Sequence, residues 1–107
     1  MTQYELHREA EGDLYAAAAF YDDHIPGLGL DFLNEFEAAV DMILEHPLAN
    51  QLWPDIPPDL GIRRKLLHRF PYGLPYMRVD DRILVLAVAH LSRDPGYWLS
   101  RAREYFG

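Results

Sequence analysis

The spacing of the hydrophobic residues changes once along the chain, and this change constrains the fold more than any other feature. From residue 8 to residue 46, apolar side chains recur every three or four positions, which is the spacing of one face of an α-helix. After residue 61 the spacing shortens toward two, which is typical of β-strands. Helices followed by strands predict an α+β fold, in which a helical layer covers one antiparallel sheet.

Two helices are predicted in the first half of the chain. The first spans residues 8–24 and ends at a proline–glycine pair that breaks the helical pattern. The second begins within residues 27–31 and ends at residue 45 or 46, because the residue before Pro47 disfavours the helical conformation. The break between them is short, so we expect an antiparallel helical hairpin. The small side chains of residues 16–19 predict close packing of the first helix on a neighbour.

Three strands and a short terminal helix are predicted in the second half, at residues 62–70, 74–79, 82–91 and 97–106. The third strand is apolar on both faces, which is typical of a central strand covered on both sides. Pro75 has no N–H group to donate, so we expect its nitrogen to face solvent or a bulge. Residues 2–6 fit a first strand or an unstructured start, and residues 48–61 fit a loop that Trp53 anchors to the core. The predicted order is β-α-α-β-β-β with a C-terminal helix.

Length and composition exclude several classes of protein. The chain has 107 residues, and we expect residues 1–107 to form one domain, because this length supports a single hydrophobic core. It has no cysteine, which excludes disulfides and thiolate metal sites and is consistent with a reducing cytoplasm. No apolar run reaches the roughly 20 residues that a bilayer requires. We therefore expect a soluble, cytoplasmic protein.

Charge is distributed unevenly along the chain. The formal net charge is −7, but residues 1–61 contain 13 acidic residues and only one basic residue, Arg8, whereas the remainder contains nine basic and four acidic residues. An acidic protein is a poor general ligand for nucleic acid, because affinity for phosphate comes from accumulated lysine and arginine. Any contact with nucleic acid must therefore be local.

The densest basic cluster lies in the first predicted strand and consists of Arg63, Arg64, Lys65 and Arg69. In a strand over residues 62–70, Arg63, Lys65 and Arg69 share one face, and Arg64 shares the other with His68. Such a cluster can simply keep a sheet face soluble or pair with the acidic helices. It can also bind an acidic protein segment or a phosphate backbone. The five histidines have no convincing metal-ligand spacing, so we expect no metal ion.

A second candidate site follows the last predicted strand. Pro95 and Gly96 force a tight corner, which brings Arg93 and Tyr97 near His90. An arginine beside a tyrosine suits recognition of a phosphodiester or a carboxylate. The alternative is a structural corner, in which Trp98 packs into the core.

Several short strings in this order resemble one protein family. They are Ala19-Phe20-Tyr21-Asp22, Pro26-Gly27-Leu28-Gly29, Phe32-Leu33, Ile43 to Pro47, Arg63, Phe70-Pro71-Tyr72, Tyr76, Val85 to His90, and Arg93 to Trp98. Together they resemble the ParE/RelE superfamily of toxins from bacterial type II toxin–antitoxin systems, and the ParE-like plasmid stabilisation branch more closely than the RelE branch.

This resemblance implies a helical hairpin on a twisted antiparallel sheet, and an antitoxin that wraps the toxin with a C-terminal helix and strand. RelE-like members cleave ribosome-bound mRNA with basic residues, an arginine and a terminal tyrosine, whereas ParE-like members inhibit DNA gyrase. Arg93 and Tyr97 match that arginine and tyrosine, and Arg64 or Lys65 can match the basic positions. A further arginine of the RNase set is replaced by Gly73. Because phosphodiester cleavage relies on several cations, this loss argues against an efficient RNase.

We therefore expect a ParE-like toxin that binds a protein target, DNA gyrase, and is neutralised by a cognate antitoxin. The alternatives are a RelE-like endonuclease acting on mRNA at the ribosome, with Arg93 and Tyr97 as catalytic residues, and an inactive relative that only binds. The residues expected to bind the antitoxin or the target are Arg63, Arg64, Lys65, Arg69 and His90. We expect no cofactor, and the sequence leaves open whether the chain forms a homodimer.

Overall fold

The computed structural model describes residues 3–105. The elements in chain order are β1 (Gln3–Leu6), α1 (Arg8–His24), α2 (Leu28–Glu45), the 3₁₀ turn η1 (Pro58–Leu60), β2 (Arg63–Leu66), β3 (Tyr72–Val79), β4 (Arg82–Val85), β5 (Ala89–His90), α3 (Gly96–Ala102) and the 3₁₀ turn η2 (Arg103–Tyr105). Both predicted long helices are confirmed. Thr2 and Phe106, which the sequence placed in the first segment and in the terminal helix, lie outside the described residues.

The predicted α+β fold is confirmed, and its sheet is mostly antiparallel with one parallel pair of strands. Its strand order is β1-β4-β3-β2, and β5 pairs with β3 beyond the end of β4. β1 runs parallel to β4, whereas the pairs β2–β3, β3–β4 and β3–β5 are antiparallel. Parallel neighbours need a long connection, and here the helical hairpin lies within the chain that separates β1 from β4.

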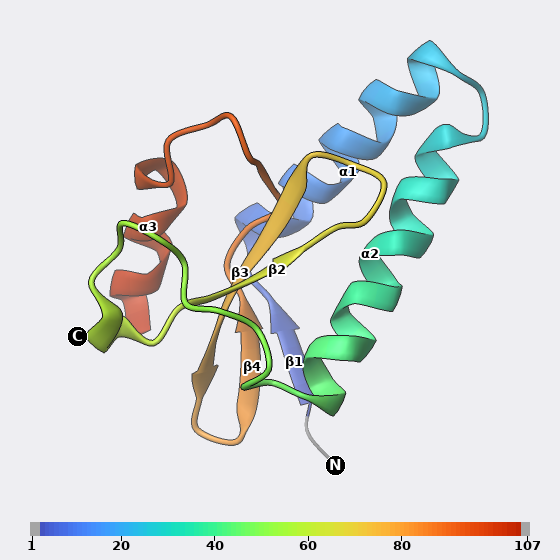
Figure 1. Ribbon diagram of the computed structural model, residues 1–107. Helices are drawn as coiled ribbons and strands as arrows, with labels where there is room; N and C mark the ends of the chain where they lie inside the picture. The colour runs from blue at the N-terminus through green and yellow to red at the C-terminus, as the bar shows by residue number, and fades with distance from the viewer. Residues whose placement is uncertain (1–2, 106–107) are drawn as a thin grey trace.

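The helices lie on opposite faces of the sheet. Figure 1 shows α1 and α2 side by side on one face and α3 on the other. Ile83 and Val85 of β4 join the core beneath the hairpin, whereas Leu84 and Leu86 join the core beneath α3 with Trp98. The prediction of a central strand covered on both sides is therefore confirmed for β4.

The hairpin is closely packed where α1 meets the first turn of α2. A Cβ atom at Gly29 would lie 2.6 Å from the backbone oxygen of Ala18. Glycine is therefore required at this crossing. The small side chains of residues 16–19 allow this approach, as predicted.

A β-bulge interrupts the predicted strand 82–91. Tyr76 pairs with Val85, but Gly73 pairs with Ala89, so two residues of β3 face three residues between β4 and β5. Pro75 lies at this bulge, which is one of the two environments expected from its missing N–H group. Leu86 N–H donates to the Pro75 carbonyl at 2.8 Å, but proline cannot return the second hydrogen bond of an antiparallel pair.

The predicted strand 62–70 is too long, because β2 ends at Leu66. The backbone N–H groups of His68 and Arg69 both donate to the Glu35 carboxylate of α2, the latter at 2.8 Å. This side chain replaces a strand partner, and the chain turns back at Phe70, whose ring is buried in the core beneath the hairpin.

The loop before β2 is attached to the sheet. Trp53 N–H donates to the Ile62 carbonyl at 2.8 Å, and Arg64 N–H donates to the Gln51 carbonyl at 2.9 Å. The Trp53 ring meets Trp98 edge-on, with centroids 5.0 Å apart, so Trp53 anchors the loop as expected. Within residues 3–105, no helix is long and apolar enough to span a membrane.

Candidate functional site

A cleft lies between α1 and the chain that leads from β5 into α3. It has a volume of about 250 Å³ and is lined by Asp13, Ala16, Ala17, Phe20, Tyr72, Val88, His90, Arg93 and Tyr97. A more open continuation of about 360 Å³ adds Tyr21 and Ser92. We call both parts together the corner cleft. Three residues singled out from the sequence, His90, Arg93 and Tyr97, therefore line one cleft.

Arg93 and Tyr97 are held together by the corner between β5 and α3. The Asp94 carboxylate accepts a hydrogen bond from Gly96 N–H at 2.7 Å, and α3 begins at Gly96. The Arg93 Cζ atom lies 3.7 Å from the centroid of the Tyr97 ring. No residue in the described range 3–105 forms an ion pair with Arg93. The guanidinium is thus oriented by an aromatic ring rather than neutralised by a carboxylate.

His90 is oriented by its neighbour Ser92. The Nδ1 atom accepts the backbone N–H of Ser92 at 3.1 Å and lies 2.8 Å from the Ser92 hydroxyl. Because Nδ1 acts as an acceptor, the hydrogen-bond pattern assigns the proton of the neutral ring to Nε2. The ring meets Tyr72 edge-on at 5.0 Å, which fixes it at the cleft.

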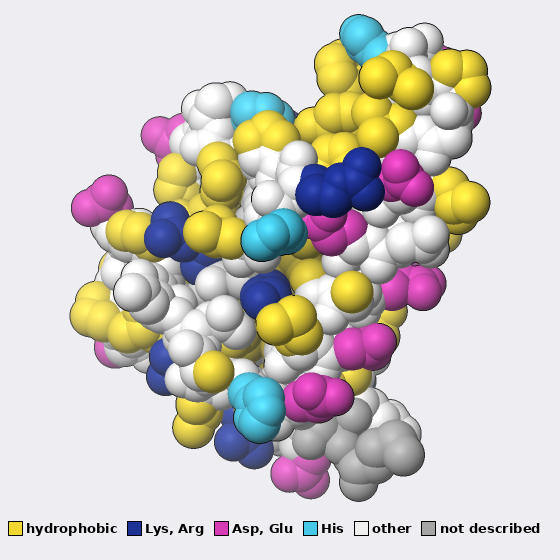
Figure 2. All heavy atoms as spheres, turned by 45° about the vertical axis from the view of Figure 1, so that its right-hand side comes forward, with side chains coloured by type: hydrophobic (Ala, Val, Ile, Leu, Met, Phe, Trp, Pro, Cys, Tyr) yellow, Lys and Arg dark blue, Asp and Glu magenta, His cyan; other side chains and the backbone are white. Residues whose placement is uncertain are grey.

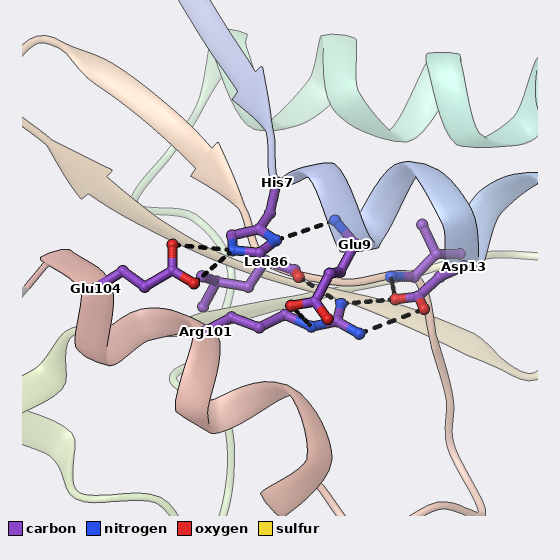
Figure 3. Close-up of polar contacts among 7 residues, drawn as sticks. His7, Glu9, Asp13, Leu86, Arg101 and Glu104 are labelled. Atoms are coloured by element: carbon purple, nitrogen blue, oxygen red, sulfur yellow. Dashed lines mark hydrogen bonds and ion pairs between the residues drawn. The ribbon is translucent and has the colours of Figure 1, made fainter.

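Asp13 of α1 also lines the cleft, and its role was not predicted from the sequence. Asp13 accepts hydrogen bonds from Arg101 Nη1 at 2.8 Å and from Val88 N–H at 3.2 Å. Arg101 Nη1 also donates to the Leu86 carbonyl at 2.9 Å, and its Nε atom lies 3.7 Å from the Glu9 carboxylate. Figure 3 shows these side chains meeting between α1 and α3.

The Asp13–Arg101 network supplies hydrogen-bond partners that the backbone lacks at the β-bulge. Leu86 lacks a return hydrogen bond from Pro75, and the Arg101 guanidinium donates to its carbonyl instead. Val88 lies within the bulge, and Asp13 accepts its N–H group. The sequence did contain one signal, because Arg93, Tyr97 and Arg101 are spaced by four residues.

Burial raises the pKa of Tyr97 above its ordinary value near 10, and the Asp13 carboxylate raises it further, whereas Arg93 and Arg101 lower it. The net direction is upward, so Tyr97 stays a neutral phenol at neutral pH. Burial also raises the pKa of Tyr72.

A loss of stability at alkaline pH follows from these tyrosines. Burial is the first cause of a raised pKa for each of Tyr21, Tyr72, Tyr76, Tyr97 and Tyr105. The unfolded chain loses its phenolic protons near pH 10, earlier than the folded protein, so the free energy of unfolding should fall as the pH rises through and beyond about 10. Urea denaturation at a series of alkaline pH values measures this. A constant or rising free energy of unfolding would contradict it.

The basic cluster does not join the corner cleft. The side chain of Arg63 donates from Nη1 to the Asn50 carbonyl at 2.7 Å, and the Arg64 guanidinium lies 5.7 Å from the Trp53 ring centroid. Arg64 and Lys65 line a separate cavity at the edge of β2. The expectation that Arg69 shares a face with Arg63 and Lys65 is wrong, because β2 ends before it. Arg69 instead lies in the turn, 3.6 Å from the Asp31 carboxylate.

Within residues 3–105, one group of side chains has ligand atoms close enough for a metal ion, namely His7, Glu9 and Glu104. However, His7 Nδ1 accepts the Glu9 backbone N–H at 3.1 Å and caps α1. The neutral ring therefore carries its proton on Nε2, which faces the Glu104 carboxylate at 3.4 Å. A metal ion at Nε2 would displace that proton and break the helix cap, so this cluster fits a hydrogen-bonded pair.

An exposed apolar surface adjoins the corner cleft at the end of the helical hairpin. Phe20 is 54% exposed, Ile25 59% and Leu30 62%. Figure 2 shows hydrophobic side chains gathered over this end of the hairpin. Phe20 belongs to both surfaces, because it also lines the cleft.

Comparison with known proteins gives the family. The model of the ParE toxin of the type II toxin-antitoxin system, parDE, matches residues 4–95. The chain belongs to the ParE toxin family. A solved structure titled "Chromosomal ParDE TA system from P. aeruginosa" superposes with a TM-score of 0.73 at 22% identity, covering 86% of this chain and 98% of that one. At this identity it supports the ParE-like fold alone. No curated protein sequence matched the chain.

The family match ends at Pro95. In this ParE family member, α3 therefore lies beyond the matched segment. The roles of Tyr97, which lines the corner cleft, and of Arg101, which pairs with Asp13, rest on the geometry of this chain.

Proposed function

We propose that this ParE family member acts by binding a protein target, DNA gyrase, in the cytoplasm, and that a cognate antitoxin neutralises it. Membership in a family of toxins from type II toxin–antitoxin systems supports a toxin with an antitoxin partner. The choice of a protein target over mRNA rests on the chemistry of the corner cleft.

The observation that carries the proposal is that the acid–base groups of the cleft are engaged or remain protonated. Asp13 accepts hydrogen bonds from Arg101 and Val88. His90 uses Nδ1 to accept the Ser92 N–H, and the pKa of Tyr97 is raised by burial. A general base for RNA cleavage needs a pKa near the working pH and a nitrogen or oxygen free to accept a proton. Among residues 3–105, Asp13 and the Nδ1 atom of His90 already accept hydrogen bonds, and burial keeps the proton on Tyr72 and Tyr97.

Among the described residues, the cleft also lacks the array of cations that an RNase needs. Gly73 stands where a RelE-like enzyme is expected to have an arginine, and a Cβ atom there would lie 3.2 Å from Leu91 and 3.2 Å from Trp53. This space is already filled, so a longer side chain would displace its neighbours. Arg64 and Lys65 lie at a different cavity. A transition state with several charged oxygens would meet one oriented guanidinium, that of Arg93.

We propose that the antitoxin contacts the edge of β2. Arg64 and Lys65 line the cavity there, whereas Arg63 and Arg69 are engaged by Asn50 and Asp31. An acidic antitoxin segment fits this edge by charge complementarity.

Induced expression in a bacterium tests the target. We expect plasmid supercoiling to fall and the DNA-damage response to rise before protein synthesis slows. The purified protein should likewise inhibit supercoiling by purified gyrase in the absence of ribosomes. Co-expression of the antitoxin gene should restore growth.

The Tyr97→Phe variant separates the two mechanisms. An endonuclease that depends on the Tyr97 hydroxyl would lose mRNA cleavage with an unchanged melting temperature, and this result would contradict the proposal. A binding toxin should not cut ribosome-bound mRNA, either as the natural protein or as the variant. Arrest of translation while supercoiling stays intact would equally reject gyrase as the target.

A further inference from the structure

We propose that the corner cleft binds an acidic side chain of a protein partner, with the carboxylate held by Arg93 and His90. This inference rests on the proposed function, because it assumes that the toxin acts through protein–protein contact. It names the chemistry of the contacting segment, which is an extended peptide with an aspartate or glutamate next to an apolar residue.

The first support is that the Arg93 guanidinium is oriented by an aromatic ring and is not neutralised by a carboxylate. Its guanidinium lies 3.7 Å from the Tyr97 ring centroid and has no ion-pair partner in the part of the chain that the structure describes. A guanidinium that lies over an aromatic ring still has its in-plane N–H groups available. Because the stacking already restricts the side chain, less conformational entropy is lost when an anion binds.

The second support is that His90 supplies another hydrogen-bond donor in the corner cleft. The hydrogen bond from Ser92 N–H to Nδ1 assigns the proton of neutral His90 to Nε2, and His90 lines the cleft beside Arg93. A carboxylate has two acceptor oxygens and is held best when each meets a donor. Arg93 and His90 therefore suit the two oxygens of one carboxylate.

The charge around the cleft favours a single carboxylate over a nucleic-acid backbone. The Asp13 carboxylate that lines it is paired with Arg101, so it does not neutralise Arg93. Beyond the cleft, the first 61 residues are strongly acidic. Binding a polyanion requires several cations acting together. One unneutralised guanidinium is enough for one carboxylate.

The shape and the apolar lining favour a peptide. The cleft extends along α1 from Asp13 to Tyr21, a rise of about 12 Å at the helical rise per residue. That length matches roughly four residues of an extended chain. Phe20 and Val88 line it, and Phe20 is 54% exposed, so an apolar side chain next to the acidic one would cover it.

Selection from a random peptide library tests the proposal with purified protein. The probes are the natural chain, Arg93→Gln and the matched control Arg103→Gln, which changes an exposed arginine outside the cleft. We expect the natural chain and Arg103→Gln to enrich peptides with aspartate or glutamate beside an apolar residue, and Arg93→Gln to lose this enrichment. For the best peptide, replacing the acid by its amide should weaken binding at least about tenfold, as expected for a hydrogen bond to a charged group. Equal melting temperatures would show that the variants fold.

Several results would overturn the proposal. These are selection without acidic enrichment, equal binding of the acid and amide peptides, and equal binding by Arg93→Gln. Displacement of the peptide by a short oligoribonucleotide that binds through Arg93 would assign the cleft to RNA, and loss of peptide binding as the protein dimerises would assign it to a second copy. The binding assay contains no gyrase, so its failure differs from failure of the proposed function. Inhibition of supercoiling without acidic selection rejects only the cleft, and acidic selection with translation arrest rejects only gyrase.

Discussion

Replacing Arg101 by methionine is expected to lower the free energy of unfolding by about 3–5 kcal/mol, as when one partner of a buried ion pair is removed. The Arg101 side chain is 8% exposed and that of Asp13 is 18% exposed. Methionine preserves much of the packing volume but leaves the Asp13 charge without its cation. It also leaves the Leu86 carbonyl without the donor that replaces Pro75. Urea denaturation of both proteins at neutral pH measures the loss.

Two further variants show whether this loss comes from the network. Arg103→Met changes an exposed arginine of η2 and is expected to cost less than about 0.5 kcal/mol, because surface substitutions usually do. Arg101→Met combined with Asp13→Leu removes both charges, and the double variant should lose clearly less stability than the two single variants added together. Full additivity would mean that Asp13 and Arg101 do not stabilise each other. A loss below about 1 kcal/mol for Arg101→Met would mean that the bulge does not depend on the guanidinium.

The parts of the fold that could be predicted are those that depend on neighbouring residues in the sequence. The two helices have a strong 3.6-residue period, so local sequence was sufficient to predict them. The missing N–H group of Pro75 limited its position to solvent or a bulge, and the structure has the bulge. The end of β2 was not predictable in this way, because it depends on Glu35 of α2 accepting the N–H groups of two residues more than thirty positions away. The parallel pairing of β1 with β4 likewise joins distant segments.

The corner cleft likewise combines a part set by local sequence with a part set by contacts between distant residues. His90, Arg93 and Tyr97 are close in sequence, so their meeting at a turn could be inferred from Pro95 and Gly96. The opposite wall comes from α1, and Asp13 is separated from Arg101 by 88 positions. Only the packing of α3 against the sheet brings these two together. The spacing of the basic cluster predicted one strand face for Arg63, Lys65 and Arg69. However, β2 ends before Arg69, and the Arg63 side chain is engaged by Asn50.

Truncating Trp98 to alanine is expected to cost about 3–5 kcal/mol, because a large buried aromatic side chain would leave a cavity. Trp98 is 0% exposed and packs with Leu84, Leu86 and the edge of Trp53 in the core beneath α3. A loss of this size is a large part of the roughly 5–15 kcal/mol that stabilises a typical domain. The variant should also disturb the corner cleft, because Trp98 fixes the helix that places Tyr97 beneath Arg93.

The Trp98→Phe variant tests whether the loss of stability comes from the cavity left by the missing ring. The Trp98 Nε1 atom is buried, and within residues 3–105 it has no hydrogen-bond partner. Phenylalanine keeps an aromatic ring and removes this unsatisfied donor, so the Phe variant should lose much less stability than the Ala variant. Denaturant unfolding should give a lower midpoint for Trp98→Ala with a similar dependence on denaturant concentration, because the exposed area changes little. Equal losses for the two variants would mean that partly filling the cavity with a phenyl ring recovers no stability, which would contradict the explanation by filled volume.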